Sequence, residues 1–222
     1  MLYFDIGANI GNWTIANIGK WSISNDGKWT ISNENQNKII ALEPIPKTFR
    51  ILQSNTSSFL NIICLNYAVC DNKGDDIIFY DALDSHTLST LNLEWLNDSK
   101  SRYYNTSYKI ITCPTITIDT LINTYGVPDL IKIDVEGGEY ECIKSLTQKA
   151  NVICFEWASE LYDISSKCLN YLFSMGYFEF YLQFEDNFEF RPSETEYYDL
   201  ETIKAQLLKT TPKKEWGMIW CK

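Results

Sequence analysis

Several features that mark other classes of protein are missing from this sequence. No apolar run approaches the roughly 20 residues that span a bilayer. The first residues, Met1 to Asp5, lack the basic head and the long apolar stretch of a secretory signal. The seven cysteines include no C-x-x-C pair, so the usual zinc and thioredoxin spacings are absent. We therefore expect a cytoplasmic protein with reduced cysteines and no membrane partner.

Positive charge is scarce as well. The chain has 19 Lys and Arg against 29 Asp and Glu, a net charge of −10, and one histidine, His86. Proteins that bind nucleic acids neutralise phosphates with Lys and Arg, so we expect no nucleic-acid partner. A chain of 222 residues, 45% hydrophobic and 22% charged, is typical of one globular domain. We predict a single domain over residues 1–222.

Short apolar runs alternate with amphipathic stretches along the chain. This alternation predicts an open α/β sheet whose strands are joined by crossover helices. We expect strands at 2–6, 39–42, 61–69, 75–80, 110–118, 130–135, 152–157, 177–184 and 216–221. We expect helices at 46–55, 119–125 (capped by Asp119), 139–147 and 165–175, and a long polar loop at 85–107. Ligands of such sheets bind at the carboxyl ends of the strands, so functional residues should follow each strand directly.

Three near-copies of an octad, at 11–18, 19–26 and 27–34, interrupt this plan. Asp5 and Glu43 lie 38 positions apart, and removing two octads leaves 22, a common spacing in a nucleotide-binding βαβ unit. We infer a tandem-repeat insertion over residues 20–35. Alternation around the turn at 25–27 predicts a hairpin, and a continued helix is the alternative. The insertion has either no selected role or that of a lip over the ligand.

The segment Asp5-Ile-Gly7-Ala-Asn9-Ile-Gly11 follows the first predicted strand and should open a helix. Gly7 permits a tight turn, Asn9 tolerates a left-handed conformation, and Gly11 lets the helix start approach a ligand. A nicotinamide site would show Gly-x-Gly-x-x-Gly, and a phosphate loop would show Gly-Lys-Ser/Thr. The segment matches neither pattern, so it predicts a loop for a different cofactor.

Two acidic residues indicate which cofactor this is. Asp5, directly before the turn, suits a cofactor that carries an ammonium group. Glu43 ends the second predicted strand and is placed to accept hydrogen bonds from both ribose hydroxyls. A molecule that joins adenosine to an amino acid, without phosphates, is S-adenosyl-L-methionine. The loop and Glu43 together predict this cofactor.

A second block, Asp129 to Glu139, ends an apolar run with a cluster of carboxylates. With the loop and the segment from Glu43 to Phe49, it gives D-x-G-A-N-x-G, E-P-x-P-x-x-F and K-x-D-x-E-G-x-E in order. Over roughly residues 2–157 the chain resembles the FkbM family of class I S-adenosylmethionine-dependent O-methyltransferases. The resemblance implies a Rossmann-like three-layer sandwich, with a mostly parallel sheet and an antiparallel C-terminal strand. It also implies methyl transfer to a hydroxyl of a sugar, a glycan or another small molecule.

The resemblance also implies roles for individual residues. The methionine end of the cofactor would be held by Asp5, Gly7, Asn9 and Gly11, and the ribose by Glu43. The adenine would be walled by Asn66, Ala68 and Val69. The methyl group and the acceptor would be faced by Asp134 and Glu136.

An alcohol is a poor nucleophile, so a base that takes its proton would accelerate the transfer by about 10²–10⁴-fold. Asp134 ranks first, because it stands at the strand end nearest the expected switch point of the sheet. The alternative is that Asp134 is a structural carboxylate that caps the next helix. Glu136 and Glu139 are further candidates, although the helix dipole alone favours acids in a first helical turn. His86 suits base work near neutral pH, or is a solvated loop residue.

The block leaves a metal site and two other functions to consider. Glu156, which ends the strand at 152–157, would line the acceptor pocket or pair with a lysine. Together with Asp134 and Glu136 it would suit Mg²⁺, but the spacing demands no metal and we expect none. A nucleic-acid methyltransferase would carry Asp/Asn-Pro-Pro-aromatic where this chain has Asp-Val-Glu-Gly. A non-catalytic partner subunit that only binds S-adenosylmethionine is the other alternative, and the loop spacing disfavours a dehydrogenase.

Overall fold

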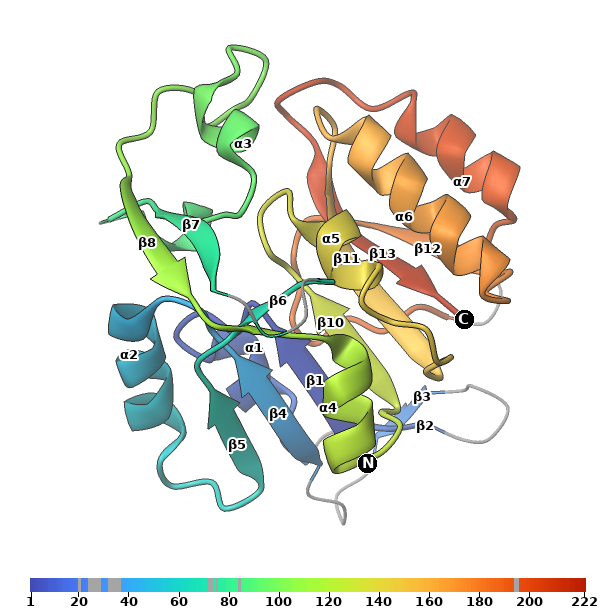
Figure 1. The fold of residues 1–222 in the computed structure, drawn as a ribbon. Helices are drawn as coiled ribbons and strands as arrows, with labels where there is room; N and C mark the ends of the chain where they lie inside the picture. The colour runs from blue at the N-terminus through green and yellow to red at the C-terminus, as the bar shows by residue number, and fades with distance from the viewer. Residues whose placement is uncertain are drawn as a thin grey trace.

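A seven-stranded sheet forms the centre of the computed structural model, which describes residues 1–19, 21–23, 29–31, 37–71, 74, 76–83, 85–193 and 196–222. Its strand order is β12-β13-β11-β10-β1-β4-β5 (Figure 1). The strands are β1 (Leu2–Ile6), β4 (Lys38–Leu42), β5 (Ile62–Leu65), β10 (Leu130–Ile133), β11 (Val152–Ala158), β12 (Phe180–Phe184) and β13 (Trp216–Cys221). Pairing is parallel from β5 to β11, whereas β13 is antiparallel to both β11 and β12. The predicted α/β class with an antiparallel C-terminal strand is confirmed.

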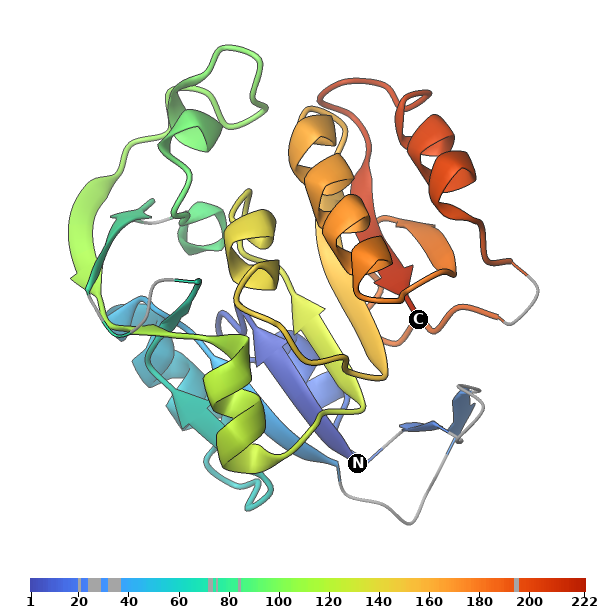
Figure 2. The ribbon, with the colours of Figure 1, turned by 45° about the vertical axis from the view of Figure 1, so that its right-hand side comes forward.

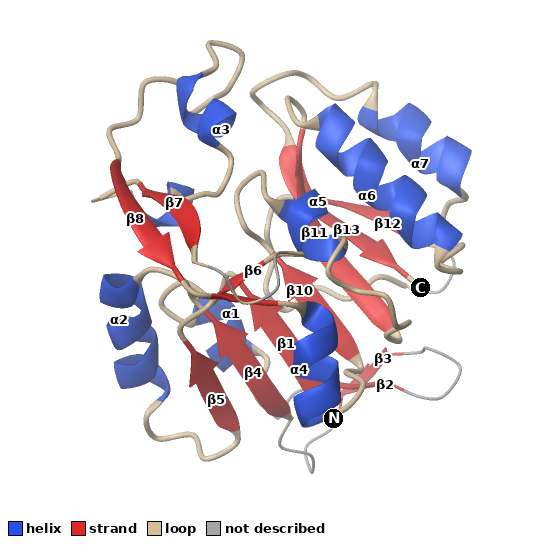
Figure 3. Cartoon of the chain, viewed as in Figure 1, coloured by secondary structure: helices blue, strands red, loops and turns tan. Residues whose placement is uncertain are grey.

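Helices cover both faces of this sheet and give three layers (Figure 3). One face carries α4 (Ile118–Tyr125), α5 (Glu139–Ile143), α6 (Tyr162–Ser174) and α7 (Leu200–Leu207). The other carries α1 (Asn12–Ala16) and α2 (Pro46–Thr56). Every residue of β10 is buried, as expected for a parallel strand covered on both faces. None of the helices in the described part of the chain has the length and apolar character that a membrane crossing requires.

Two small strand pairs lie outside the central sheet. β6 (Ala68–Val69) pairs with β9 (Thr115–Ile116), and β7 (Ile77–Asp81) pairs with β8 (Lys109–Cys113). The predicted strand 61–69 is therefore wrong as one unit, because it divides into β5 and β6. The predicted loop 85–107 contains a short 3₁₀ helix, η1 (His86–Leu88), and the helix α3 (Leu93–Asn97). These elements lie beyond the carboxyl ends of the central strands (Figure 1).

Two local predictions are corrected by the structure. Asp119 does not cap α4; the hydroxyl of Thr117 accepts a hydrogen bond from the Thr120 N–H at 3.0 Å instead. The Asp119 carboxylate binds Thr147, whose backbone N–H donates to it at 2.8 Å. The structure also contains α7, a helix that the sequence pattern did not predict and that is capped by Asp199. The helix predicted at 139–147 is shorter and ends as α5 at Ile143.

The octads adopt two different structures. The first contains α1, whereas the second and third contain the strands β2 (Trp21–Ile23) and β3 (Trp29–Ile31), which pair antiparallel with Trp21 opposite Ile31. This pairing agrees with the predicted hairpin, whose turn at 25–27 falls outside the described residues. The hairpin lies near the N-terminus, at the end of the sheet opposite β7 and β8 (Figure 2). The origin of residues 20–35 as an insertion stays a hypothesis.

We predict that Gly11→Ala destabilises the fold. Gly11 has φ of 93°, and an added Cβ would lie 2.8 Å from Cδ1 of Leu52 on α2. Left-handed strain and overpacking together should lower the free energy of unfolding by roughly 2–4 kcal/mol, measured by urea denaturation.

Gly74→Ala is the matched control, because Gly74 has φ of 85° and nothing within 4 Å of an added Cβ. It should cost only the conformational strain of about 1–2 kcal/mol. Equal losses for both variants would show that the α1–α2 contact does not require glycine.

Candidate functional site

A cavity of about 210 Å³ lies at the carboxyl ends of β1, β4 and β10. This is the edge at which open parallel sheets bind ligands. Most of the residues predicted for the site line it, namely Gly7, Asn9, Glu43, Ala68, Val69, Asp134 and Glu136. None of the described hairpin residues lines it, so the structure gives no support to a lip over the ligand.

The turn after β1 brings two strand ends into contact. Gly7 has φ of 79°, and a Cβ there would lie 1.8 Å from the carbonyl oxygen of Asp134. No side chain fits at this position, so glycine is required for the approach of the β1 and β10 ends. Asn9 also has positive φ, 50°, and its buried Oδ1 has no hydrogen-bond partner within the described residues. A buried oxygen without a donor is a candidate contact for a bound water, ion or ligand.

Glu43 connects this turn to the end of β4. Its carboxylate accepts hydrogen bonds from the backbone N–H of Asn9 at 3.1 Å and of Ile45 at 2.9 Å. Burial raises the pKa of Glu43 to about 7, although these two hydrogen bonds oppose the shift. The carboxylate retains acceptor capacity toward the cavity, because it accepts only these two hydrogen bonds from the described residues.

Asn66 contributes from outside the cavity wall. Its Nδ2 donates to the carbonyl oxygens of Glu43 at 2.8 Å and of Pro44 at 2.9 Å. The structure places Asn66 behind Glu43 and outside the cavity wall, whereas Ala68 and Val69 line the cavity. Asn66 holds the backbone that carries Glu43.

A buried lysine, Lys132 on β10, connects the turn after β1 to the end of β10. Its Nζ lies 3.3 Å from Oδ1 of Asp5 and 3.2 Å from Oδ2 of Asp134, and donates to the Gly7 carbonyl at 3.2 Å. Burial disfavours the ammonium form, but the negative charges of Asp134, Asp5 and Asp186 outweigh it and raise the pKa of Lys132. Lys132 is thus a charged centre that fixes both strand ends.

Asp5 and Gly11 lie outside the cavity wall, in contrast to their predicted contact with a methionine end. Asp5 is fully buried, and its carboxylate accepts a hydrogen bond from Thr14 and pairs with Lys132. Gly11 is required for packing against Leu52 on α2. Both residues therefore support the loop from outside the cavity wall.

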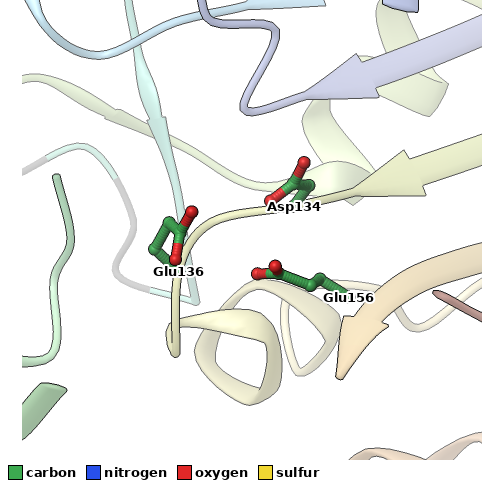
Figure 4. A group of neighbouring side chains, drawn as sticks. All are labelled: Asp134, Glu136 and Glu156. Carbon is green, nitrogen blue, oxygen red and sulfur yellow. The ribbon is translucent and has the colours of Figure 1, made fainter. Parts of the chain in front are cut away.

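Three carboxylates converge beside the cavity (Figure 4). Oxygens of Asp134, Glu136 and Glu156 all lie within 4.8 Å of one another. Burial and the charge of Asp134 raise the pKa of Glu136, and burial and the charge of Glu136 raise that of Glu156. Such oxygen ligands suit Mg²⁺.

Glu136 is held in an unusual conformation within this group. Its φ is 54°, in the left-handed region that few residues other than glycine adopt, and Trp95 Nε1 donates to its Oε2 at 3.1 Å. Its backbone oxygen accepts a hydrogen bond from Thr90. Strain of this kind is concentrated at functional sites, which marks Glu136 as a candidate.

The other two candidate bases have different placements. Glu139 accepts hydrogen bonds from the N–H groups of Val135 at 3.2 Å and Gly137 at 3.1 Å, so it organises the turn before α5. Glu136 precedes that helix rather than lying in its first turn. His86 lies in η1, and its side chain falls outside the described residues, so its role as a base stays a prediction.

Sequence reasoning missed several residues of the cavity wall, of which Lys132, Asp186 and Phe188 matter most here. Lys132 could have been found, because it stands two positions before Asp134 on the same strand face. Asp186 and Phe188 follow β12 without any motif around them. Only the folded chain brings them to this edge.

A model of the methyltransferase FkbM domain matches residues 5–191, which include the turn, Glu43 and the three carboxylates. No curated protein matches the chain. The chain is similar in structure to precorrin-6y C5,15-methyltransferase from Geobacter metallireducens GS-15, with 13% identity, a TM-score of 0.46, and 100% of this chain and 79% of that one covered. It is also similar to Aeropyrum pernix fibrillarin in complex with natively bound S-adenosyl-L-methionine, with 10% identity, a TM-score of 0.44, and coverage of 100% and 65%.

We predict that Lys132→Met strongly destabilises the protein. The substitution leaves Asp5 buried without a counter-ion, and loss of one partner of a buried pair costs about 3–5 kcal/mol. Lys144→Met is the control, because Lys144 pairs with Asp71 and Glu141 at the surface and should cost at most about 1 kcal/mol. Urea denaturation measures both, and similar losses would contradict the central role of Lys132.

Glu43 should give stability a specific pH dependence. Its pKa of about 7 in the folded chain exceeds its ordinary value of 4.5, so the folded chain holds a proton that the unfolded chain releases. This group's contribution to stability therefore falls as pH rises from about 4.5 to 7. Relative to wild type, Glu43→Gln should gain roughly 3 kcal/mol of unfolding free energy between about pH 4 and pH 8. A difference that does not change with pH would show that the pKa of Glu43 in the folded chain stays at its ordinary value of 4.5.

Proposed function

Since the chain belongs to the FkbM methyltransferase family, we propose that it transfers a methyl group to a hydroxyl of a sugar, a glycan or another small hydroxylated molecule. S-adenosyl-L-methionine is the methyl donor of this enzyme. The donor supplies a methyl group on a positively charged sulfur. The choice of a hydroxyl as acceptor is supported by a proton-accepting carboxylate, Glu136, in the wall of the donor cavity.

The cavity fits this donor in its chemistry. The unpartnered Oδ1 of Asn9 would face the methionine part, next to Gly7 in the cavity wall. Glu43 would accept hydrogen bonds from the ribose hydroxyls, and Ala68 and Val69 would pack on the adenine. The buried position of Glu43 gives these hydrogen bonds strength, because water does not compete for the carboxylate.

Glu136 is the residue that we propose as the base. A hydroxyl must lose its proton as it attacks, and a base works best when its pKa is near the working pH. Asp134 ranked first from the sequence, but its carboxylate is already paired with the Lys132 ammonium group at 3.2 Å. The charge of Asp134 instead raises the pKa of Glu136, whose Oε2 is held by Trp95. Two carboxylates with different environments thus take different roles.

The acceptor would enter from the side of the cavity formed by the segment around η1. Thr87 and Ser89 line that side and offer hydroxyl groups for hydrogen bonds, and Tyr67 adds an aromatic ring. A polyhydroxylated molecule suits such a surface. The net charge of −10 opposes a nucleic-acid acceptor.

We predict that Glu136→Gln lowers turnover by about 10²–10⁴-fold, because the hydroxyl proton loses its acceptor. Binding of S-adenosylhomocysteine, measured by calorimetry, should stay within about threefold of wild type. Turnover is measured as S-adenosylhomocysteine release over a panel of sugar nucleotides and oligosaccharides. Glu141→Gln on the exposed side of α5 is the control for loss of one carboxylate.

Asp134→Asn should shift the pH profile of turnover, since removing its charge lowers the pKa of Glu136. The acid limb of that profile should therefore move to lower pH.

A Glu136→Gln variant with full turnover contradicts the assignment of the base, and His86→Gln then tests the histidine. A protein that binds S-adenosylhomocysteine but methylates no member of the panel contradicts the proposed acceptor class.

A further inference from the structure

The segment from Glu185 to Arg191 leaves β12 and places two residues in the wall of the donor cavity, Asp186 and Phe188. The partly buried carboxylate of Asp186 makes no hydrogen bond or ion pair within the part of the chain that the structure describes. It lies in the electrostatic field of Lys132 and Asp134. Asp186 is therefore an acceptor without a donor, facing the space where a ligand would lie.

The charges around this space do not balance. Asp5, Asp134 and Asp186 surround one ammonium group, that of Lys132. Asp5 is sealed behind the turn by Thr14 and Lys132, and Asp134 is paired with Lys132. The excess negative charge is left at Asp186, and a cationic ligand group would compensate it.

Arg191 anchors this segment through the octad hairpin. The centre of its guanidinium lies 5.3, 4.8 and 5.3 Å from the ring centroids of Trp21, Trp29 and Trp220. It donates to the carbonyl of Phe190 at 2.6 Å. Stacking against three indole rings holds the guanidinium in one orientation.

Asn17, directly after α1, holds the same segment from the other side. Its Nδ2 donates to the carbonyl of Phe188 at 3.1 Å, and its Oδ1 accepts a hydrogen bond from Arg191. The backbone between Phe188 and Arg191 is thus fixed to the octad region at two points. This connection places Asp186 at the cavity.

We propose that Asp186 binds the amino group of the donor's methionine part, and that Arg191, held by the octad tryptophans, positions it. The inference rests on the proposed function only in that S-adenosyl-L-methionine is the methyl donor. It does not depend on which acceptor is methylated. It assigns the octad hairpin a role in donor binding, exerted through the segment behind the cavity. It also places the ammonium partner on Asp186 in place of the sealed Asp5.

Two ligands that differ in the amino acid part test the proposal. S-adenosylhomocysteine carries the amino group, whereas 5′-methylthioadenosine retains the nucleoside and lacks the whole amino acid part. Calorimetry with Asp186→Asn should show affinity for S-adenosylhomocysteine reduced by about tenfold or more, as expected for a lost charged hydrogen bond. Affinity for 5′-methylthioadenosine should change by less than about twofold.

Glu185→Gln is the matched control, since Glu185 is the adjacent exposed carboxylate and does not line the cavity. It should leave both affinities unchanged. Equal losses of both ligands with Asp186→Asn would indicate a merely structural role and overturn the proposal. Unchanged binding of S-adenosylhomocysteine would overturn it as well.

Arg191→Met tests the positioning step, because it keeps apolar bulk among the indole rings and removes the charge and the donors. We expect a loss of about three- to tenfold for S-adenosylhomocysteine alone, with the thermal midpoint confirming a folded protein. No change would overturn the role of Arg191, and if this variant does not fold, Asp186→Asn decides.

A wild type that binds S-adenosylhomocysteine without methylating any hydroxyl contradicts the proposed function and leaves this inference standing.

Discussion

One buried ammonium group organises the site. Asp5 and Lys132 are direct partners in the parallel pairing of β1 with β10, so their side chains share one face of the sheet. Burial alone would neutralise Lys132, yet the Gly7 carbonyl and the carboxylates of Asp5 and Asp134 hold the charged form. The same contacts fix the turn after β1 and the strand end that carries the carboxylates. The proposed donor site and the proposed reaction site therefore share one electrostatic centre.

The ion pair with Lys132 also distinguishes Asp134 from the two neighbouring glutamates. Asp134 forms an ion pair with Lys132, whereas Glu136 and Glu156 lie close to Asp134 without a cation of their own within the described chain. Their raised pKa follows from burial and from neighbouring negative charge. Three carboxylates that look equivalent in the sequence thus divide into one paired with an ammonium group and two whose pKa is raised.

The central strands could be predicted because β1, β4, β10 and β11 are buried on both faces and leave continuous apolar runs in the sequence. The helix α7 lacks such a run, and the division into β5 and β6 depends on the pairing of β6 with β9, which only the fold supplies. In the site, Glu43 and Gly7 follow from their positions after strands. The burial of Asp5 depends on Thr14 and Lys132, and the place of Asp186 depends on a segment with no motif.

The octads show how far local sequence falls short of structure. Nearly identical octads give the helix α1 once and the strands β2 and β3 afterwards, so position in the fold overrides propensity here. The tryptophan of each octad packs against another aromatic ring or against Arg191. Trp13 packs against Tyr3, Trp29 against Trp220, and Trp21 joins Trp29 around Arg191. Trp13 and Trp29 both pack into the cluster on the sheet face that carries α1, because an indole contributes burial in either backbone conformation. Similar octads can therefore bury a ring on the same face with different secondary structures.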